Sequence, residues 1–327
     1  MKGGPLDRRT FMIRCVKAGL ASATALGLGF SLHDPAGPSR FSEEIQEARV
    51  PDFRVAGAEP RLVVVKGADR AKSLRAGMSA IGGLDGFVKP GDRVALKVNA
   101  AFASPPALGA TTHPELVSEL IRLCLSAGAK SVVVTDNPIN DPFTCFELSG
   151  ISGATRSAGG QVILPQADAF RPVTIEGGLL IRRWPVLIEP LQRVDKLIGV
   201  APIKDHHRSG ASMAMKNWYG LLGGQRSLFH QDIHTIIQEL ALMVRPTLVI
   251  LDGTVTMMKN GPTGGSFSDL RKTDTLIIST DQVAADAFGA TLLGKSAADF
   301  PFIRKAAEAG LGSADYRAIK VIETSAA

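Results

Sequence analysis

Cysteine is scarce in this chain of 327 residues: there are three, and no two of them are spaced as C-x-x-C. Cys15 lies near the N-terminus, Cys124 falls on the apolar side of an expected helix, and Cys145 begins another. The sequence therefore offers neither a thiolate set for an iron-sulfur cluster nor a redox dithiol. Cys124 and Cys145 are expected to be buried thiols, with a disulfide between them left open if the compartment is oxidising.

Aromatic residues and blocks of basic residues are also scarce. The chain has two Trp and two Tyr, and no run of Lys and Arg with interleaved aromatics. Such a chain lacks the stacking platform and the cationic stripe of a nucleic-acid-binding protein, so no nucleic-acid partner is expected. The formal net charge of +6 is no guide to partners, because residues 1–40 carry six Lys/Arg and two Asp and so hold +4 of it.

Three familiar site motifs are missing as well. No G-K-[ST] follows the glycine-rich stretches 220–224 and 261–265, and no G-x-G-x-x-G follows the first expected strand. An ordinary nucleotide-binding loop is thus not indicated, and both stretches are expected to be turns. His230 and His234 are four residues apart, but they do not form H-E-x-x-H and show no third ligand, so the pair does not favour a zinc hydrolase.

What the N-terminus does contain is the ordered features of an export signal, predicted to span residues 1–38. Charged residues precede a weakly apolar run over 18–30, and Arg8-Arg9-Thr10-Phe11-Met12 resembles the twin-arginine motif. The run is shorter than the roughly 20 apolar residues of a spanning helix, so no stable transmembrane helix is expected after leader removal. We expect a periplasmic or otherwise exported protein that uses the twin-arginine export machinery. The cleavage site, and retention of the leader as an anchor, stay open.

The rest of the chain is predicted to be a linker over 39–60 and a single α/β domain over 61–325. Expected strands cover residues 61–66, 93–98, 131–136, 196–203, 247–252 and 275–279, and expected helices cover 69–81, 114–127, 143–157, 209–222, 232–243 and 281–293. Apolar strands that alternate with helices predict a mostly parallel sheet covered by helices on both faces. The frequent Pro and Gly near 161–190 predict a small antiparallel insertion there.

Polar residues follow most of the expected strands at the point where each strand ends. Candidate binding residues of this kind are Lys97, Asn99, Asp136, Asp252 and Gly253, and candidate catalytic residues are Lys204 and His206. The carboxyl ends of parallel strands meet at one edge of a sheet, where open α/β proteins bind ligands. The amino group of a lysine within an apolar strand must either pair with an anion or extend to water. Lys97 lies in such a strand and is therefore a candidate.

Two further segments add candidates to this edge. Lys216 and Asn217 precede the bulky Trp218 and Tyr219, and would reach the same crevice if their helix folds back over the strand end. His230 is a candidate acid, base or ligand. Burial or a neighbouring cation would lower a lysine pKa toward the working range of a base or nucleophile.

The ordered set of motifs resembles a known family. Its members are Lys97-x-Asn99, Thr112-His113-Pro114, Pro202-x-Lys204-x-His206, Lys216-Asn217-x-x-Gly220, His230, Asp252-Gly253, Gly261-Pro262-x-Gly264 and Asp281-x-x-Ala284-x-Asp286. Together they resemble the domain-of-unknown-function family 362 from about residue 64 to residue 312. The resemblance implies no settled reaction. Many members of the family carry a ferredoxin-type cysteine module, which this chain lacks, so it implies the matched positions as the site but no iron-sulfur cluster.

Three hypotheses remain open at this point. The leading one is an exported enzyme or cofactor-binding protein whose cationic crevice holds a small anionic ligand, with a metal or an acquired cofactor possible and not specified. In it, Lys97, Lys216 and Asn217 hold anionic oxygens, Lys204 and His206 transfer protons or form a covalent link, and His230 with Asp252 ligates a metal or orients the others. The second is a non-catalytic periplasmic ligand- or metal-binding or maturation protein. The third is an electron-transfer protein of the iron-sulfur kind.

Overall fold

The protein is described here by a computed structural model that covers residues 7–31 and 46–326. The chain divides into two compact units, residues 1–40 and residues 41–327. The predicted start of the linker, residues 39–45, lies outside the described residues.

The first unit contains one helix, α1 (Arg8–Ser31). Asp7 precedes it and accepts hydrogen bonds from the backbone N–H groups of Arg9 and Thr10, so the arginine pair lies in the first turn. The stretch 8–29 has a mean hydropathy of 1.3 and is long and apolar enough to cross a membrane, a test that a signal sequence also passes. The helix is therefore longer than the apolar run expected from the sequence, because it extends back through the arginine pair.

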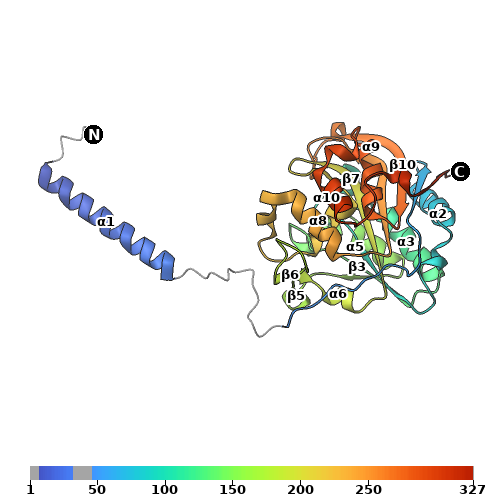
Figure 1. Cartoon of the computed structure of the whole chain (residues 1–327), viewed down its shortest axis with the longest axis horizontal. Helices are drawn as coiled ribbons and strands as arrows, with labels where there is room; N and C mark the ends of the chain where they lie inside the picture. The colour runs from blue at the N-terminus through green and yellow to red at the C-terminus, as the bar shows by residue number, and fades with distance from the viewer. Residues whose placement is uncertain (1–6, 32–45, 327) are drawn as a thin grey trace. The chain divides into compact units, whose positions relative to one another are not determined.

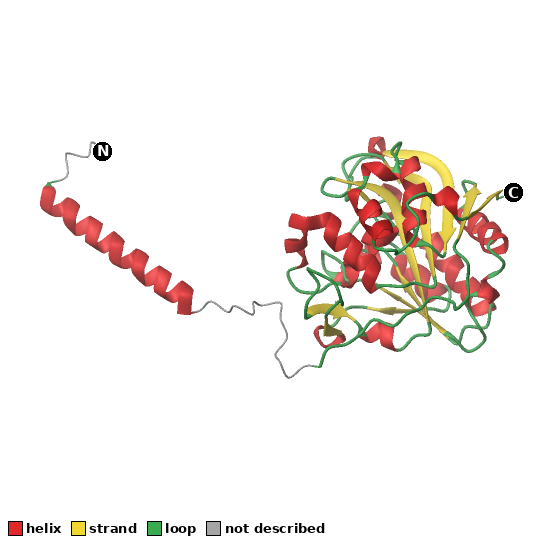
Figure 2. Ribbon diagram, viewed as in Figure 1, coloured by secondary structure: helices red, strands yellow, loops and turns green. Residues whose placement is uncertain are grey.

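The second unit is built on a sheet of nine strands (Figures 1 and 2). The order across it is β11 (Lys320–Ser325), β1 (Arg61–Lys66), β10 (Leu270–Ser279), β9 (Leu248–Met257), β7 (Lys196–His206), β2 (Arg93–Lys97), β3 (Ser131–Thr135) and β4 (Gln161–Ile163), with β8 (Gly210–Ser212) paired to β7. β10 is antiparallel to β1 and β9, and β8 is antiparallel to β7; the other neighbours are parallel. The mostly parallel sheet predicted from the strand pattern is confirmed.

Helices cover both faces of this sheet, as predicted. One face packs on α2 (Arg70–Ala80), α3 (Pro114–Ser126), α4 (Pro142–Leu148) and α5 (Ile151–Ser157), and the other on α6 (Glu189–Gln192), α7 (Ala214–Asn217), α8 (Ile233–Met243), α9 (Gln282–Leu292) and α10 (Pro301–Glu308). Alternation along β2 shows the division: Val94 and Leu96 join the first core and Ala95 joins the second. Short 3-10 turns η1–η8 cover Leu84–Gly86, Pro106–Leu108, Ala167–Ala169, Trp218–Leu221, Arg226–Asp232, Phe267–Asp269, Ala297–Asp299 and Tyr316–Ala318.

The expected antiparallel insertion is present as β5 (Phe170–Val173) paired with β6 (Trp184–Leu187), a separate two-stranded sheet. Two expected helices differ from the prediction. The one over 143–157 is divided at Gly150, which has a left-handed φ of 72°. The one over 209–222 is β8, α7 and η4, because β7 continues past Ile203 to His206 and pairs with the returning chain.

The predicted linker packs on the domain where the structure describes it. The side chain of Phe53 is 3% exposed, and its backbone N–H donates to the carbonyl of Arg245. The backbone N–H of Ala48 likewise donates to the carbonyl of Pro172. Residues 46–60 therefore lie along the α/β domain instead of forming a free spacer.

Candidate functional site

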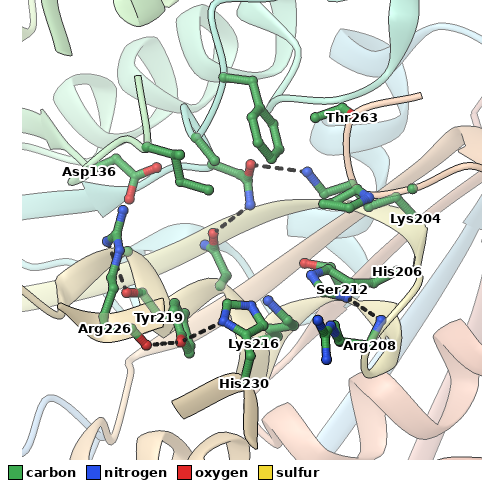
Figure 3. A pocket seen from close by; sticks show the side chains of 18 of the residues that line it. Asp136, Lys204, His206, Arg208, Ser212, Lys216, Tyr219, Arg226, His230 and Thr263 are labelled. Carbon is green, nitrogen blue, oxygen red and sulfur yellow. Dashed lines mark hydrogen bonds between the residues drawn. The ribbon is translucent and has the colours of Figure 1, made fainter. Parts of the chain in front are cut away.

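A cleft of about 680 Å³ lies at the carboxyl ends of β2, β3 and β7. The rest of its wall is formed by Phe102, by residues of α7 and η5, and by the loop 260–263. Segments far apart in the sequence therefore meet around the cleft (Figure 3). Eight of the predicted site residues line it: Lys97, Asn99, Asp136, Lys204, His206, Lys216, Asn217 and His230. The parallel strands bring them together because their carboxyl ends share one edge of the sheet.

Asp252 and Gly253 do not line this cleft. The expected strand ends at Asp252, but β9 continues to Met257, so both residues lie within the strand. Asp252 accepts a hydrogen bond from Nε of Arg70 at 2.6 Å, an ion pair outside the cleft. A Cβ at Gly253 would lie 2.6 Å from the end of the Leu292 side chain and 3.0 Å from the carbonyl of Thr275, so α9 and β10 pack closely at this position. The suggested pairing of Asp252 with His230 is therefore wrong.

Lys97 forms the floor of the cleft, and its ammonium group is fully partnered. Its Nζ lies 2.7 Å from Oδ1 of Asp136 and donates to the carbonyls of Val98 at 2.7 Å and Asn217 at 2.8 Å. Burial lowers the pKa of Lys97, while the charge of Asp136 acts in the opposite direction. With these acceptors in place, Lys97 organises the floor and has little left to offer a ligand.

The close approach of η4 to this ion pair depends on Gly220. A Cβ at Gly220 would collide with the carboxylate of Asp136 and lie 2.8 Å from Nζ of Lys97. The backbone N–H of Asn137 donates to the carbonyl of Gly220 at 2.9 Å, which joins η4 to the end of β3. Glycine is therefore what allows the chain carrying Lys216 to close over the floor.

Lys204 and Asn99 form the next layer. Nζ of Lys204 donates to the carbonyl of Ala110 at 2.5 Å and to Oδ1 of Asn99 at 3.3 Å, and it lies 5.1 Å from the centroid of the Phe102 ring. Nδ2 of Asn99 in turn donates to Oδ1 of Asn217 at 3.3 Å. Burial, with the nearby Lys216 cation as a smaller cause, lowers the pKa of Lys204 to about 7.

Lys216 differs from both other lysines. Its Nζ lies 4.8 Å from the centroid of the Tyr219 ring, and it makes no hydrogen bond or ion pair with any residue that the structure describes. Burial, with the charge of Arg226 as the second cause, lowers the pKa of Lys216 to about 7. A large fraction of this amine is consequently neutral near neutral pH, facing the cleft.

His206 is held in one tautomer. The backbone N–H groups of Arg208 and Ser209 donate to its Nδ1 at 3.1 and 3.3 Å, so Nδ1 carries a lone pair and the proton of the neutral ring is on Nε2. Burial first, and then the charge of Lys216, lower the pKa of His206 to about 2. His206 is thus a neutral N–H donor.

His230 is held in the opposite tautomer. Its Nδ1 lies 3.1 Å from the carbonyl oxygen of Ser227, which only accepts, so Nδ1 carries the proton and Nε2 has the lone pair. The Tyr219 hydroxyl donates to the carbonyl of Arg226 and therefore accepts from the same Nδ1 at 3.3 Å. The rings of His206 and His230 lie nearly parallel with centroids 6.1 Å apart. A donor and an acceptor imidazole thus face the same cleft.

Two arginines in this site were not predicted. Arg226 joins the loop after β3 to the chain around η4. Its guanidinium donates to the carbonyls of Tyr219 at 3.2 Å, Leu222 at 3.0 Å, Asn137 at 2.8 Å and Pro138 at 2.9 Å. Arg208 lines the cleft, and its guanidinium has no acceptor among the described residues. Arg226 showed no signal in the sequence because its four acceptors are backbone carbonyls.

The loop 260–263, taken from the sequence as a plain turn, also lines the cleft. It approaches β7 so closely that a Cβ at Gly261 would collide with the backbone of Asp205. The carboxylate of Asp205 accepts a hydrogen bond from the backbone N–H of Gly261 at 3.1 Å. The signal available in the sequence was the glycine pair around Pro262.

The His, Cys, Asp and Glu side chains of the protein are the ones that could ligate a metal ion. Within residues 7–31 and 46–326, no group of three or more His, Cys, Asp or Glu side chains is arranged to hold a metal ion. Cys124 and Cys145 are buried free thiols, as their default predicted, and burial raises their pKa values to about 12 and about 11. Among the described residues, the ionisable side chains that line the cleft are those of lysines, arginines and histidines, together with Asp136 and Tyr219.

The fold and the site thus define an α/β protein with a cationic cleft at one edge of its sheet. The chain belongs to the family described as Domain of unknown function (DUF362), whose model matches residues 94–291. The family resemblance drawn from the sequence is confirmed over those residues. The chain is also 28% identical over 252 residues to a protein named as thylakoid-associated from Synechocystis, covering 73% of this chain and 74% of that one.

Two solved structures resemble the chain more distantly. The lactate racemase apoprotein of Thermoanaerobacterium thermosaccharolyticum is 14% identical with a TM-score of 0.43, over 74% of this chain and 58% of its own. A structural-genomics protein from Thermotoga maritima is 13% identical with a TM-score of 0.28, over 68% of this chain and 54% of its own. The chain thus spans less than two thirds of either structure.

Proposed function

We propose that this protein is an exported enzyme that binds a small organic anion in the cleft and catalyses proton transfer on it. The observation that carries the proposal is the pair of opposite tautomers: His206 presents an N–H to the cleft and His230 presents a lone pair. Proton transfer needs a base within reach of the proton and a donor that stabilises the developing negative charge. The two rings supply one of each.

The charge of the cleft supports an anionic ligand. Its lining contains basic side chains, with one carboxylate among the described residues, Asp136; the basic residues are Lys97, Lys204, Lys216, Arg208 and Arg226. Asp136 is engaged with Lys97, and Arg226 with backbone carbonyls. Arg208 is left to hold a carboxylate or phosphate group in a bidentate manner, which a guanidinium does well.

Export is part of the proposal and depends on the N-terminal segment. The arginine pair stands in the first turn of α1, ahead of its apolar part. A large sheet with parallel strands folds slowly, which suits a route that carries folded proteins. Fusion of residues 1–40 to a folded reporter tests this: export is expected to require Arg8 and Arg9, and export of the Arg8→Lys/Arg9→Lys fusion at the wild-type level would contradict it.

The activity is tested on the full-length protein in two steps. Calorimetry with pyruvate, malate, succinate and inorganic phosphate identifies a bound anion, and proton NMR in D₂O then follows exchange of the C–H protons next to its carboxylate or carbonyl group. We expect His206→Phe and His230→Phe to keep the affinity and lose the exchange. Exchange at the wild-type rate in both variants would overturn the assignment of the two rings.

Arg208→Met tests the anion contact. A hydrogen bond to a charged group contributes about 1.5–3 kcal/mol, so the dissociation constant should rise at least about tenfold. Arg193→Met is the matched control, because Arg193 is exposed and pairs with Glu189 on α6. Equal affinities for the two variants would show that Arg208 does not hold the anion.

A further inference from the structure

The three lysines of the cleft differ in what their amino groups contact. Lys97 is paired with Asp136 and two carbonyls, and Lys204 donates to a carbonyl and an amide oxygen. Nζ of Lys216 lies 4.8 Å from the centroid of the Tyr219 ring and has no hydrogen-bond or ion-pair partner among the described residues. A buried amine that has an aromatic face but no carboxylate or carbonyl partner has only weak stabilisation of its charged form, so its neutral form, with a lone pair able to react, is favoured.

We propose that Lys216 is a nucleophile that forms an imine with a carbonyl compound bearing an anionic group, such as a 2-oxo acid. This inference rests on the proposed function and names the substrate class of the same cleft. It follows from three placements: an unpartnered amine in α7, a lone-pair nitrogen on His230, and an N–H donor on His206, all lining one cavity (Figure 3).

The step balances without an oxidant or reductant. The lone pair of Nζ of Lys216 attacks the carbonyl carbon, and the carbonyl π electrons move to oxygen, which accepts a hydrogen bond from Nε2 of His206. Nε2 of His230 carries a proton from nitrogen to oxygen to give the carbinolamine. The carbinolamine then loses its oxygen with both amine protons as water, and the imine remains. The pKa of about 7 of Lys216 makes the neutral amine available for the first step.

The imine also connects with the proposed proton transfer. The imine nitrogen then takes a proton from solvent water, and the protonated imine draws electrons from the neighbouring carbon and makes its C–H more acidic. The lone pair of His230 is then the base that removes this proton. Arg208 at the rim holds the anionic group and so orients the carbonyl toward Lys216.

Reductive trapping tests the proposal directly. The full-length protein is incubated with pyruvate or 2-oxoglutarate and sodium cyanoborohydride, digested, and mapped by mass spectrometry. We expect Lys216 to gain the mass of the oxo acid less one oxygen atom, at a rate that rises as pH passes through about 7. Lys272, an exposed lysine of β10, is the internal control for non-specific reaction.

Two variants complete the design. Lys216→Met and Lys216→Arg should show no adduct at this peptide, and Lys272→Arg should label at Lys216 as the wild type does. Labelling of the wild type at Lys216 no faster than at Lys272, for every oxo acid that the cleft binds, would overturn the imine. If Lys216 were not labelled but the wild type still bound the oxo acid and catalysed C–H exchange, the proposed function would be kept and only the role of Lys216 as nucleophile would be rejected. If the wild type neither bound an anion nor catalysed exchange, both the proposed function and the imine would be rejected.

Discussion

Nζ of Lys97 and Oδ1 of Asp136 lie 2.7 Å apart beneath the cleft, with the two side chains 1% and 2% exposed. The pair joins the ends of β2 and β3, and the same ammonium reaches across to the carbonyl of Asn217 in α7. It is therefore the point at which the strand ends and the segment carrying Lys216 are held together.

Asp136→Asn should destabilise the protein strongly. The change leaves the Lys97 ammonium buried without its counter-charge, which costs about 3–5 kcal/mol. Chemical denaturation measures the loss. Glu308→Gln is the matched control: it breaks the exposed pair with Arg304, and should change the free energy of unfolding by no more than about 0.5 kcal/mol. Similar losses in both variants would show that burial of the first pair has no energetic consequence.

Gly220→Ala should disturb the same place by steric means. The added Cβ meets the carboxylate of Asp136, and overpacking of this kind costs about 1–3 kcal/mol. Gly153→Ala is the control, because nothing lies within 4 Å of its Cβ position and α5 should gain about 0.5–1 kcal/mol from alanine. Thermal melts and pyruvate titrations of both variants make the comparison; a Gly220→Ala protein with wild-type stability and affinity would contradict the packing argument.

The stability of the protein should depend on Lys216 in a pH-dependent way. Its folded pKa of about 7 lies below the unfolded value of about 10.4, so between these values the unfolded chain holds a proton that the folded chain lacks. Stability attributable to Lys216 therefore rises with pH across this window, by up to about 1.4 kcal/mol per pH unit.

The measurement is the difference in unfolding free energy between wild type and Lys216→Met, taken from urea titrations at several pH values from 7 to 10. The difference cancels contributions of opposite sign, such as that of Asp286, whose pKa burial raises to about 8. A difference that stays constant with pH would show that Lys216 titrates normally in the folded protein.

Asp252→Asn should separate stability from binding. Its ion pair with Arg70 is largely buried, so loss of the charge should cost about 3 kcal/mol of unfolding free energy. Because Asp252 does not line the cleft, the affinity for pyruvate should be unchanged. Calorimetry measures the affinity for pyruvate at a temperature where the variant is folded. A tenfold weaker affinity would show that Asp252 contributes to the binding site.

The apolar periodicity of the chain was enough to determine the class of fold. The strand beginning at Arg61 and the helix beginning at Pro114 start where the sequence predicts, because local propensity, caps and alternation all agree there. The rule that ligands bind beyond parallel strand ends was likewise enough to collect Lys204 and His206 at one cleft.

Tertiary structure alone decided what each of these groups can do. Whether a lysine is charged and paired or neutral and free depends on acceptors supplied by distant segments: Lys97 meets Asn217, 120 residues away, while Lys216 meets no acceptor among the described residues. The tautomers of His206 and His230 follow from backbone groups only two or three residues away, in the turn after β7 and in η5, but the residue pattern does not report these turn geometries. Asp252 does not line the cleft because β9 continues beyond it to Met257, and pairing with β10 sets this continuation. A sequence pattern reports which groups are present, but the hydrogen-bond partners and burial that determine reactivity depend on backbone turns and on contacts between distant segments, and both are set by the folded chain.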